Sequence, residues 1–130
     1  TKVLLVDDNP FNLIFPRAML EKRGFDVLVA YNGKEGIEVV EKHAKDLLFI
    51  LMDLQMPVMD GFEAAEILNH KMQENEIPSI PIIALSANDF LQGKDRFIDS
   101  GMDGYLMKPV KEGEIDDLLR KFHFQKETQL

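Results

Sequence analysis

The chain has 130 residues, of which 45% are hydrophobic and 29% charged, a composition typical of one soluble globular domain. Its formal net charge of −8 argues against binding to nucleic acid or to an anionic membrane, because their phosphates would repel it. The absence of cysteine excludes disulfides, thiolate catalysis and cysteine-based zinc sites. The longest apolar run, Leu47 to Met52, is too short to span a membrane, so we expect no direct membrane insertion.

Five apolar runs alternate with five segments of helical pattern along the chain. The runs predict strands at Lys2–Val6, Phe25–Ala30, Leu47–Met52, Ile82–Leu85 and Gly104–Met107. They are continuous rather than alternating, which is typical of strands covered on both faces. This order of elements predicts an α/β fold, a doubly wound parallel sheet with right-handed crossovers and helices on both faces.

The helices have recognisable ends. Asn9-Pro10 predicts an N-cap followed by proline in the first turn of the first helix, and Gly24 predicts where that helix stops. Asn32 and Asp60 are expected to cap the second and third helices. The last helix carries apolar residues at amphipathic spacing, namely Ile115, Leu118, Leu119 and Phe122.

Polar groups follow four of the five predicted strands: Asp7-Asp8, Asp53, Ser86 and Lys108. Because parallel strands end at one edge of a sheet, we expect these groups to share a small space, where sites of such folds form. Carboxylates about 4 Å apart repel by roughly 4 kcal/mol at an effective dielectric constant of about 20, so a cation must compensate. Oxygen ligands favour Mg²⁺, and no histidine lies near these strand ends to favour zinc or copper. One carboxylate could then attack phosphorus, while Lys108 and Ser86 stabilise the transferred group.

Four motifs in this order resemble those of the receiver domains of two-component signalling proteins. They are Val-Asp-Asp-Asn-Pro at 6–10, Met-Asp-Leu-Gln-Met-Pro-Val-Met-Asp-Gly at 52–61, Ala-Leu-Ser-Ala at 84–87 and Lys-Pro at 108–109. Asn-Pro after the acidic pair, together with Ser-Gly-Met-Asp-Gly-Tyr-Leu at 100–106, is most similar to receivers attached to hybrid sensor histidine kinases. The resemblance implies a flavodoxin-like sheet of strand order 2-1-3-4-5 with five helices, a receiver domain over 1–123, and a C-terminal tail or the start of a linker over 124–130.

The resemblance also implies chemical roles for single residues. Asp53 would be the phosphoacceptor, and Asp7 and Asp8 would hold Mg²⁺ together with Asp53 and the backbone carbonyl of Gln55. Lys108 would form an ion pair with the phosphoryl group.

A second set of residues would transmit the phosphorylated state. Ser86 would donate a hydrogen bond to the phosphoryl group, and Tyr105 matches the aromatic position that turns inward as the hydroxyl moves. The alternative for Tyr105 is a packing role. Phosphorylation would then change the surface of Asp89–Ser100. The family also implies a cis peptide bond before Pro109.

The implied phosphodonor is a histidine kinase or a histidine phosphotransfer domain. A receiver promotes its own phosphorylation and dephosphorylation without being a stand-alone enzyme. The sequence has no signal peptide, and we expect a cytoplasmic protein. The absence of an initiator Met suggests a piece of a longer protein, which could be a cytoplasmic module of a membrane-anchored parent such as a hybrid kinase. The open alternative is a scaffold that keeps the receiver fold and binds a kinase or phosphotransfer partner without phosphorylation, although the intact acidic set argues against it.

The first helix has more apolar residues than one sheet face can cover. Pro16, Met19 and Leu20 form a stripe that can face the sheet, and Pro16 also predicts a kink, because it removes the hydrogen bond to the carbonyl of Asn12. A second stripe and a nearby loop are expected to dock the helical phosphodonor: Phe11, Ile14, Phe15, Ala18, Pro109 and Val110. The alternative is that the two phenylalanines tuck under neighbouring loops.

Overall fold

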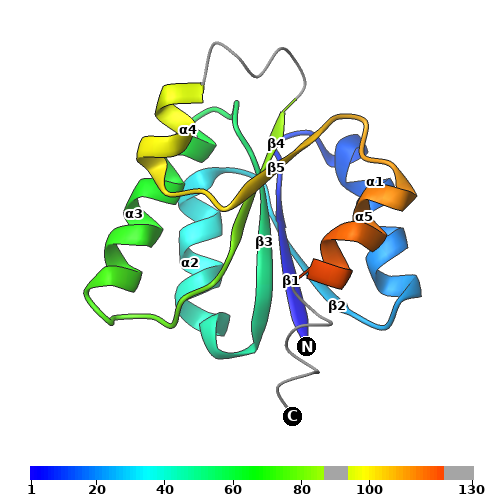
Figure 1. The fold of residues 1–130 in the computed structure, drawn as a ribbon, viewed down its shortest axis with the longest axis horizontal. Coiled ribbons are helices and arrows are strands. Elements are labelled where there is room, and N and C mark those ends of the chain that lie inside the picture. Colours follow the sequence, from blue (N-terminus) through cyan, green and yellow to red (C-terminus); the bar gives the residue numbers. More distant parts are fainter. Residues whose placement is uncertain (87–93, 122–130) are drawn as a thin grey trace.

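Five parallel strands form one sheet in the computed structural model, which describes residues 1–86 and 94–121. The strands are β1 (Lys2–Val6), β2 (Asp26–Ala30), β3 (Leu47–Asp53), β4 (Ile82–Ser86) and β5 (Gly104–Met107), and they lie in the order β2-β1-β3-β4-β5. The helices are α1 (Pro10–Lys22), α2 (Gly33–His43), α3 (Gly61–Gln73), α4 (Lys94–Ser100) and α5 (Glu112–Leu119), with a short 3₁₀ turn, η1 (Ala44–Asp46), before β3. α1 and α5 cover one face of the sheet, and α2, α3 and α4 cover the other (Figure 1). The predicted fold class and strand order are confirmed.

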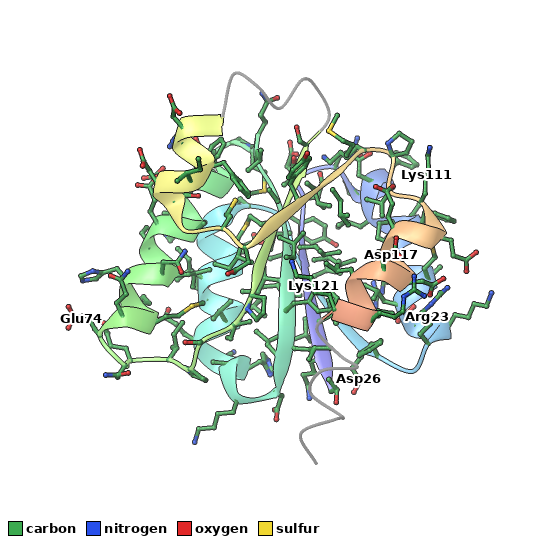
Figure 2. All side chains as sticks on the ribbon, in the orientation of Figure 1. Arg23, Asp26, Glu74, Lys111, Asp117 and Lys121 are labelled. Carbon is green, nitrogen blue, oxygen red and sulfur yellow. The ribbon has the colours of Figure 1, made fainter. Side chains whose placement is uncertain are left out.

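Both faces of the sheet are buried, which explains the continuous apolar runs in the sequence. All seven residues of β3 are buried. Phe49 and Leu51 pack in the layer of α1 and α5, whereas Ile50 and Met52 pack in the layer of α2 and α3. Charged side chains such as that of Glu74 lie on the outside (Figure 2).

The register of the strands brings their carboxyl ends to the same level, at the upper edge of the sheet in Figure 1. The last residue of β1 lies opposite Met52 of β3, so Asp7 and Asp53 follow side by side. On the other side of β3, Ser86 ends β4 opposite the last residue of β5, directly before Lys108. The topology therefore gathers the predicted polar groups at one edge.

The predicted helix ends are present. The side chains of Asn9, Asn32 and Asp60 each accept a hydrogen bond from a backbone N–H in the first turn of α1, α2 and α3, at 3.0, 2.9 and 2.8 Å. Gly24 follows the end of α1 with φ at +90°, a conformation that suits glycine. α1 continues through Pro16 to Lys22, and the kink expected at this proline stays a prediction.

Three strand boundaries differ from the prediction by one residue. β3 runs on to Asp53 and β4 to Ser86, because backbone hydrogen bonds to the neighbouring strand continue at their ends. β2 begins after Phe25, whose N–H donates to the carbonyl of Leu20 in α1 instead of to the sheet.

Some predictions fall outside the described residues. They concern Phe122, the last apolar position predicted for α5, the tail or linker predicted over 124–130, and residues 89–93 of the surface predicted to change on phosphorylation. Within 1–86 and 94–121, no helix has the length and apolar character needed to cross a bilayer.

Candidate functional site

Three carboxylates lie together at the carboxyl edge of the sheet. Asp7 and Asp8 follow β1, and Asp53 is the last residue of β3. One oxygen atom from each carboxylate lies within 4.8 Å of one from each of the others. Asp7 and Asp53 are buried, whereas Asp8 is exposed. The structure thus brings together the acidic residues that the sequence predicted as one group.

Lys108 reaches the two buried carboxylates from the end of β5. Its Nζ lies 2.8 Å from Asp7 Oδ2 and 3.0 Å from Asp53 Oδ1. Its backbone N–H donates to the carbonyl oxygen of Ser86 at 2.7 Å, which ties the end of β5 to the end of β4. The peptide bond between Lys108 and Pro109 is cis, as predicted. The ammonium group therefore bridges Asp7 and Asp53.

Burial and charge act against each other in this cluster. Burial raises the pKa of Asp53 to about 6; the contact with Lys108 opposes this rise, and the negative charge of Asp7 adds to it. Burial alone would lower the pKa of Lys108, but its pairs with Asp7 and Asp53 outweigh burial and raise that pKa. At neutral pH the lysine is therefore charged and Asp53 is mainly an ionised carboxylate.

The donor atoms suit a hard divalent cation. Three carboxylates face one ammonium group, so negative charge is in excess when all three are ionised. Asp7 Oδ2 is fully buried and, although Lys108 Nζ lies at ion-pair distance, it accepts no hydrogen bond of regular geometry among the described residues. An all-oxygen set of this kind fits Mg²⁺, which completes its shell with waters and phosphate oxygens. The carbonyl of Gln55 as a further ligand stays a prediction.

The loop that follows Asp53 is held close to the carboxylates. The N–H of Gln55 donates to Asp53 Oδ1 at 3.4 Å, and the N–H of Leu54 donates to the carbonyl of Leu85 in β4. Gly61 N–H closes the loop on the carbonyl of Leu54, and a Cβ atom at Gly61 would lie 2.1 Å from the carbonyl oxygen of Asp53. Only a residue without a side chain allows this approach. Gly61 was not among the predicted site residues, although the Asp-Gly pair at 60–61 marks a close turn.

The two residues predicted to transmit phosphorylation lie at different depths. Ser86 is buried at the end of β4. Tyr105 on β5 is half-exposed, and its ring packs edge-to-face against Phe97 of α4 with 6.1 Å between ring centroids. Tyr105 thus faces α4 in this structure.

The outer face of α1 is apolar and exposed. Phe11, Ile14 and Phe15 are 81%, 62% and 52% exposed, so the alternative that the phenylalanines tuck under loops is wrong. A cavity of about 150 Å³ lies between this face and the loop after β5, lined by Phe11 and Phe15 on one side and Pro109 and Val110 on the other. Ala18 is exposed on the same helix, and Val110 is buried.

Asn12 contacts Asp7 but was not among the predicted site residues. Its Nδ2 lies 3.5 Å from Asp7 Oδ1, from the exposed side of α1. The available signal was a single polar side chain inside an otherwise apolar run between Pro10 and Pro16.

The sequence matches a known family and several longer proteins. The family model described as response regulator receiver domain matches residues 3–120. The sensor protein GacS of Pseudomonas syringae pv. syringae is 39% identical over 121 residues, 93% of this chain and 13% of GacS. Hybrid signal transduction histidine kinase B of Dictyostelium discoideum is 41% identical over 122 residues, 88% of this chain and 6% of the kinase. The chain therefore spans a small part of these relatives.

Two solved structures have the same fold. The receiver domain of sensor histidine kinase PA1611 from Pseudomonas aeruginosa PAO1, which has a magnesium ion coordinated in its active site cleft, superimposes with a TM-score of 0.80 at 32% identity, covering 93% of this chain and 95% of that one. The Saccharomyces cerevisiae co-crystal structure of the histidine phosphotransfer protein Ypd1 with the receiver domain of Ssk1 gives a TM-score of 0.83 at 29% identity, covering 93% of this chain and 87% of that one.

Proposed function

Because the chain belongs to the response regulator receiver domain family, we propose that it accepts a phosphoryl group on Asp53 from a phosphohistidine, with Mg²⁺ as cofactor. The observation that carries the proposal is the bridge from Lys108 Nζ to Asp7 Oδ2 and Asp53 Oδ1 inside an all-oxygen acidic cluster. This bridge places a cation beside a carboxylate that is mainly ionised at neutral pH.

The chemistry is a transfer between two nucleophiles. An oxygen of the Asp53 carboxylate attacks phosphorus, the new O–P bond gives an acyl phosphate, and the N–P bond of the donor breaks with its electron pair left on the imidazole. An ionised carboxylate needs no general base for this step. Asp7, Asp8, Asp53 and the carbonyl of Gln55 would hold Mg²⁺, which when bound would neutralise charge on the phosphoryl oxygens.

Lys108 and Ser86 act on the transferred group. Lys108 Nζ is already 3.0 Å from Asp53 Oδ1. Its ammonium group can therefore pair first with the carboxylate and then with the phosphoryl oxygens once they are bound. The Ser86 hydroxyl, at the adjacent strand end, donates to the same group. Its movement would let Tyr105 leave Phe97 and turn inward, which changes the surface of α4.

The exposed face of α1 is proposed to dock the donor, a histidine kinase or a histidine phosphotransfer domain. Phe11, Ile14, Phe15 and Ala18 present an apolar surface, and the cavity beside it extends to Pro109 and Val110. The face adjoins Lys108, so a partner seated there would hold its histidine close to Asp53. The Ypd1–Ssk1 neighbour, a receiver with a phosphotransfer protein, supports this kind of partner.

Acetyl phosphate or phosphoramidate with Mg²⁺ tests the phosphoacceptor directly. Intact-mass measurement should show wild type gaining one phosphoryl group and Asp53→Asn gaining none. The alternative function, a scaffold that binds a partner without phosphorylation, predicts no gain for wild type even with a cognate kinase.

A matched pair of variants tests the docking face. Ile14→Ser should slow transfer from a protein donor while leaving phosphorylation by acetyl phosphate unchanged. Ile98→Ser is the control, because Ile98 on α4 has the same exposed fraction, 62%, but lies on the other face of the sheet. Equal slowing by both substitutions, or slowing with acetyl phosphate as well, would contradict docking on α1.

The bounds of the domain and the kind of protein that contains it are also part of the proposal. We place the receiver at 1–123 and treat 124–130 as a tail or the start of a linker, in a cytoplasmic protein or a cytoplasmic module of a hybrid histidine kinase. The much greater length of the relatives supports the second form. The gene sequence that flanks this segment would show whether a kinase core adjoins it.

A further inference from the structure

The first turns of α1 carry one polar side chain that breaks an apolar run. Asn12 lies between Phe11 and Leu13, and the next polar residue along the helix is Arg17. Asparagine is a poor helix former, so alanine at this exposed helical position would give a more stable helix. Helix stability by itself therefore does not favour asparagine at this position.

Asn12 instead contacts the buried carboxylate of Asp7. Its Nδ2 lies 3.5 Å from Asp7 Oδ1, and the backbone N–H of Asn9 donates to the same oxygen at 2.9 Å. The other oxygen, Asp7 Oδ2, is 2.8 Å from Lys108 Nζ. The two oxygens of Asp7 therefore have different partners. The start of α1 holds Oδ1, and Oδ2 lies next to Lys108 Nζ, which also contacts Asp53 Oδ1 at 3.0 Å.

We propose that Asn12 is a positioning residue for Mg²⁺ binding, which acts by holding Asp7 Oδ1 so that Oδ2 stays directed into the acidic cluster. The inference rests on the proposed function, because it takes the cation to be Mg²⁺. Without the Asn12 amide, one donor to Oδ1 is lost and the carboxylate can rotate about its terminal bond. Partners that orient a metal ligand in this way typically contribute tenfold to a hundredfold to metal affinity.

The expected effect of Asn12 lies at or below the lower end of that range. The contact is long, and the Asn9 N–H remains on the same oxygen at 2.9 Å. We therefore expect Asn12→Ala to weaken Mg²⁺ binding by about threefold to tenfold. Asn12→Leu, which keeps the size but not the donor, should do the same. Asn12→Gln, whose amide can still reach Asp7, should recover most of the affinity.

The experiment titrates MgCl₂ into the whole chain at constant ionic strength and follows the rise in unfolding temperature, from which the affinity for Mg²⁺ follows. Arg17→Ala is the control, because it also replaces an exposed polar residue of α1 but lies one turn further from Asp7. Its Mg²⁺ affinity should equal that of wild type. Phosphorylation by acetyl phosphate provides the second measurement: Asn12→Ala should need more Mg²⁺ for half-maximal rate but reach the wild-type rate at saturating Mg²⁺.

The outcomes separate this inference from the proposal on which it rests. Wild-type affinity in Asn12→Ala and Asn12→Leu would overturn the positioning role, even if transfer from a protein donor fell, since that result would make Asn12 part of the docking face alone. A wild-type protein that Mg²⁺ does not stabilise at all would overturn the proposed function and this inference with it.

Discussion

At the scale of single residues, the site depends on how closely the loop after β3 can approach Asp53. A Cβ atom at Gly61 would lie 2.1 Å from the Asp53 carbonyl oxygen, so a side chain there must displace the end of β3 or the start of α3. We expect Gly61→Ala to lower the free energy of unfolding by about 1–3 kcal/mol and to slow phosphoryl uptake, because the carboxylate moves with its backbone. Chemical denaturation and mass measurement with acetyl phosphate check both effects.

Gly113 provides the matched control for Gly61. It lies in the first turn of α5, and an added Cβ would meet no atom within 4 Å. Gly113→Ala should therefore raise the free energy of unfolding by roughly 0.5–1 kcal/mol, the usual gain in a helix, and leave phosphoryl uptake unchanged. If both glycine substitutions destabilised the protein equally, contact with Asp53 would not be the cause.

The pKa of Asp53 predicts a pH dependence of stability. Its folded-state pKa is raised to about 6 from the ordinary value of 3.8, so between these values the folded protein binds more protons than the unfolded chain. Stability from this group is complete below pH 3.8 and is lost as pH rises through about 6. Without Mg²⁺, wild type should therefore lose stability relative to Asp53→Asn as pH rises from 4 to 6. Denaturation of both proteins in EDTA across this range measures the difference in their free energies of unfolding. The contributions of other titrating groups largely cancel in that difference. A difference that stays constant with pH would contradict the raised pKa.

The residues of the site differ in how far the sequence could predict them. Asp53 and Lys108 follow apolar runs, so the strand pattern alone places them at one edge, and the ordered motifs of the family add their roles. Asn12 and Gly61 could not be assigned in this way, because their importance lies in one contact each, with an Asp7 oxygen and the Asp53 carbonyl. Such contacts depend on side-chain and loop geometry that periodicity does not specify.

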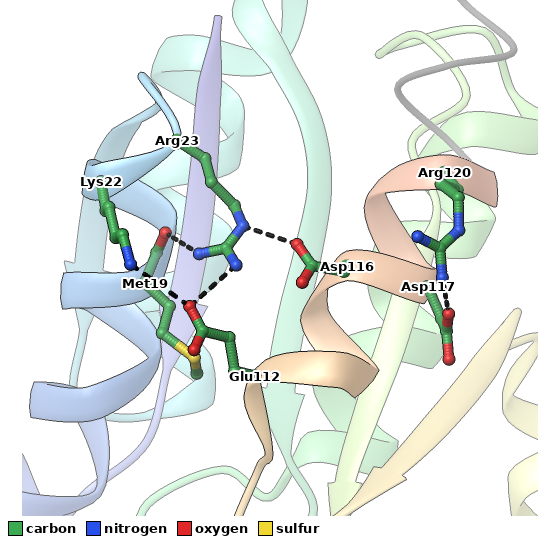
Figure 3. A network of polar contacts seen from close by, with 7 residues as sticks. All are labelled: Met19, Lys22, Arg23, Glu112, Asp116, Asp117 and Arg120. Carbon is green, nitrogen blue, oxygen red and sulfur yellow. Dashed lines mark hydrogen bonds and ion pairs between the residues drawn. The ribbon is translucent and has the colours of Figure 1, made fainter.

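At the scale of elements, an ionic cluster joins the end of α1 to the start of α5 (Figure 3). Arg23 donates from Nε to Asp116 Oδ1 at 2.7 Å, from Nη2 to Glu112 Oε2 at 2.9 Å, and from Nη1 to the carbonyl of Met19 at 2.9 Å. Lys22 Nζ is 3.6 Å from the same Glu112 oxygen. These hydrogen bonds lower the pKa of Glu112 and Asp116 and raise that of Arg23. One guanidinium group thus fixes two elements that are about 90 residues apart in the chain.

The cluster predicts a salt-sensitive stability. Arg23→Met should lower the unfolding midpoint in urea, and the loss should be larger at low ionic strength, where charge pairs are least screened. Because the pKa values of Glu112 and Asp116 are lowered, the contribution should be present at neutral pH and vanish as both groups take up protons in acid. Arg17→Met is the control, since its pair with Glu21 is about half-exposed and lies within α1. The same loss in both variants at every salt concentration would show that Arg23 contributes only local helix stability.

Helices and strands themselves were largely predictable, and their ends less so. Caps such as Asn32 and the stop at Gly24 are local signals, and the exposed apolar face of α1 followed from counting its stripes. The start of β2 was predicted one residue early because Phe25 is apolar, yet its N–H bonds to the carbonyl of Leu20 in α1. Hydrophobic pattern reports burial, whereas a strand boundary depends on the hydrogen-bond partner.

At the scale of the whole molecule, the parallel sheet concentrates negative charge at one edge of a chain whose net charge is already −8. The clustered carboxylates suit a cation, but without one they destabilise the folded state. The three carboxylates repel one another, and Lys108 compensates for this repulsion only in part. Binding of Mg²⁺ to the folded state alone should therefore stabilise the entire domain.

Asp8 allows this coupling to be measured with little disturbance of the fold. It contributes a carboxylate to the cluster but is exposed, so Asp8→Asn removes one charge without leaving a cavity. For wild type, Mg²⁺ at ten times its dissociation constant should raise the free energy of unfolding by about 1.4 kcal/mol, whereas Asp8→Asn should gain much less at the same concentration. Asp26→Asn, an exposed aspartate at the opposite end of the sheet (Figure 2), is the control and should gain as much as wild type. Urea denaturation with and without MgCl₂ at matched ionic strength gives these values. Equal gains in all three proteins would mean that Mg²⁺ acts by general screening of charge and not at the acidic cluster.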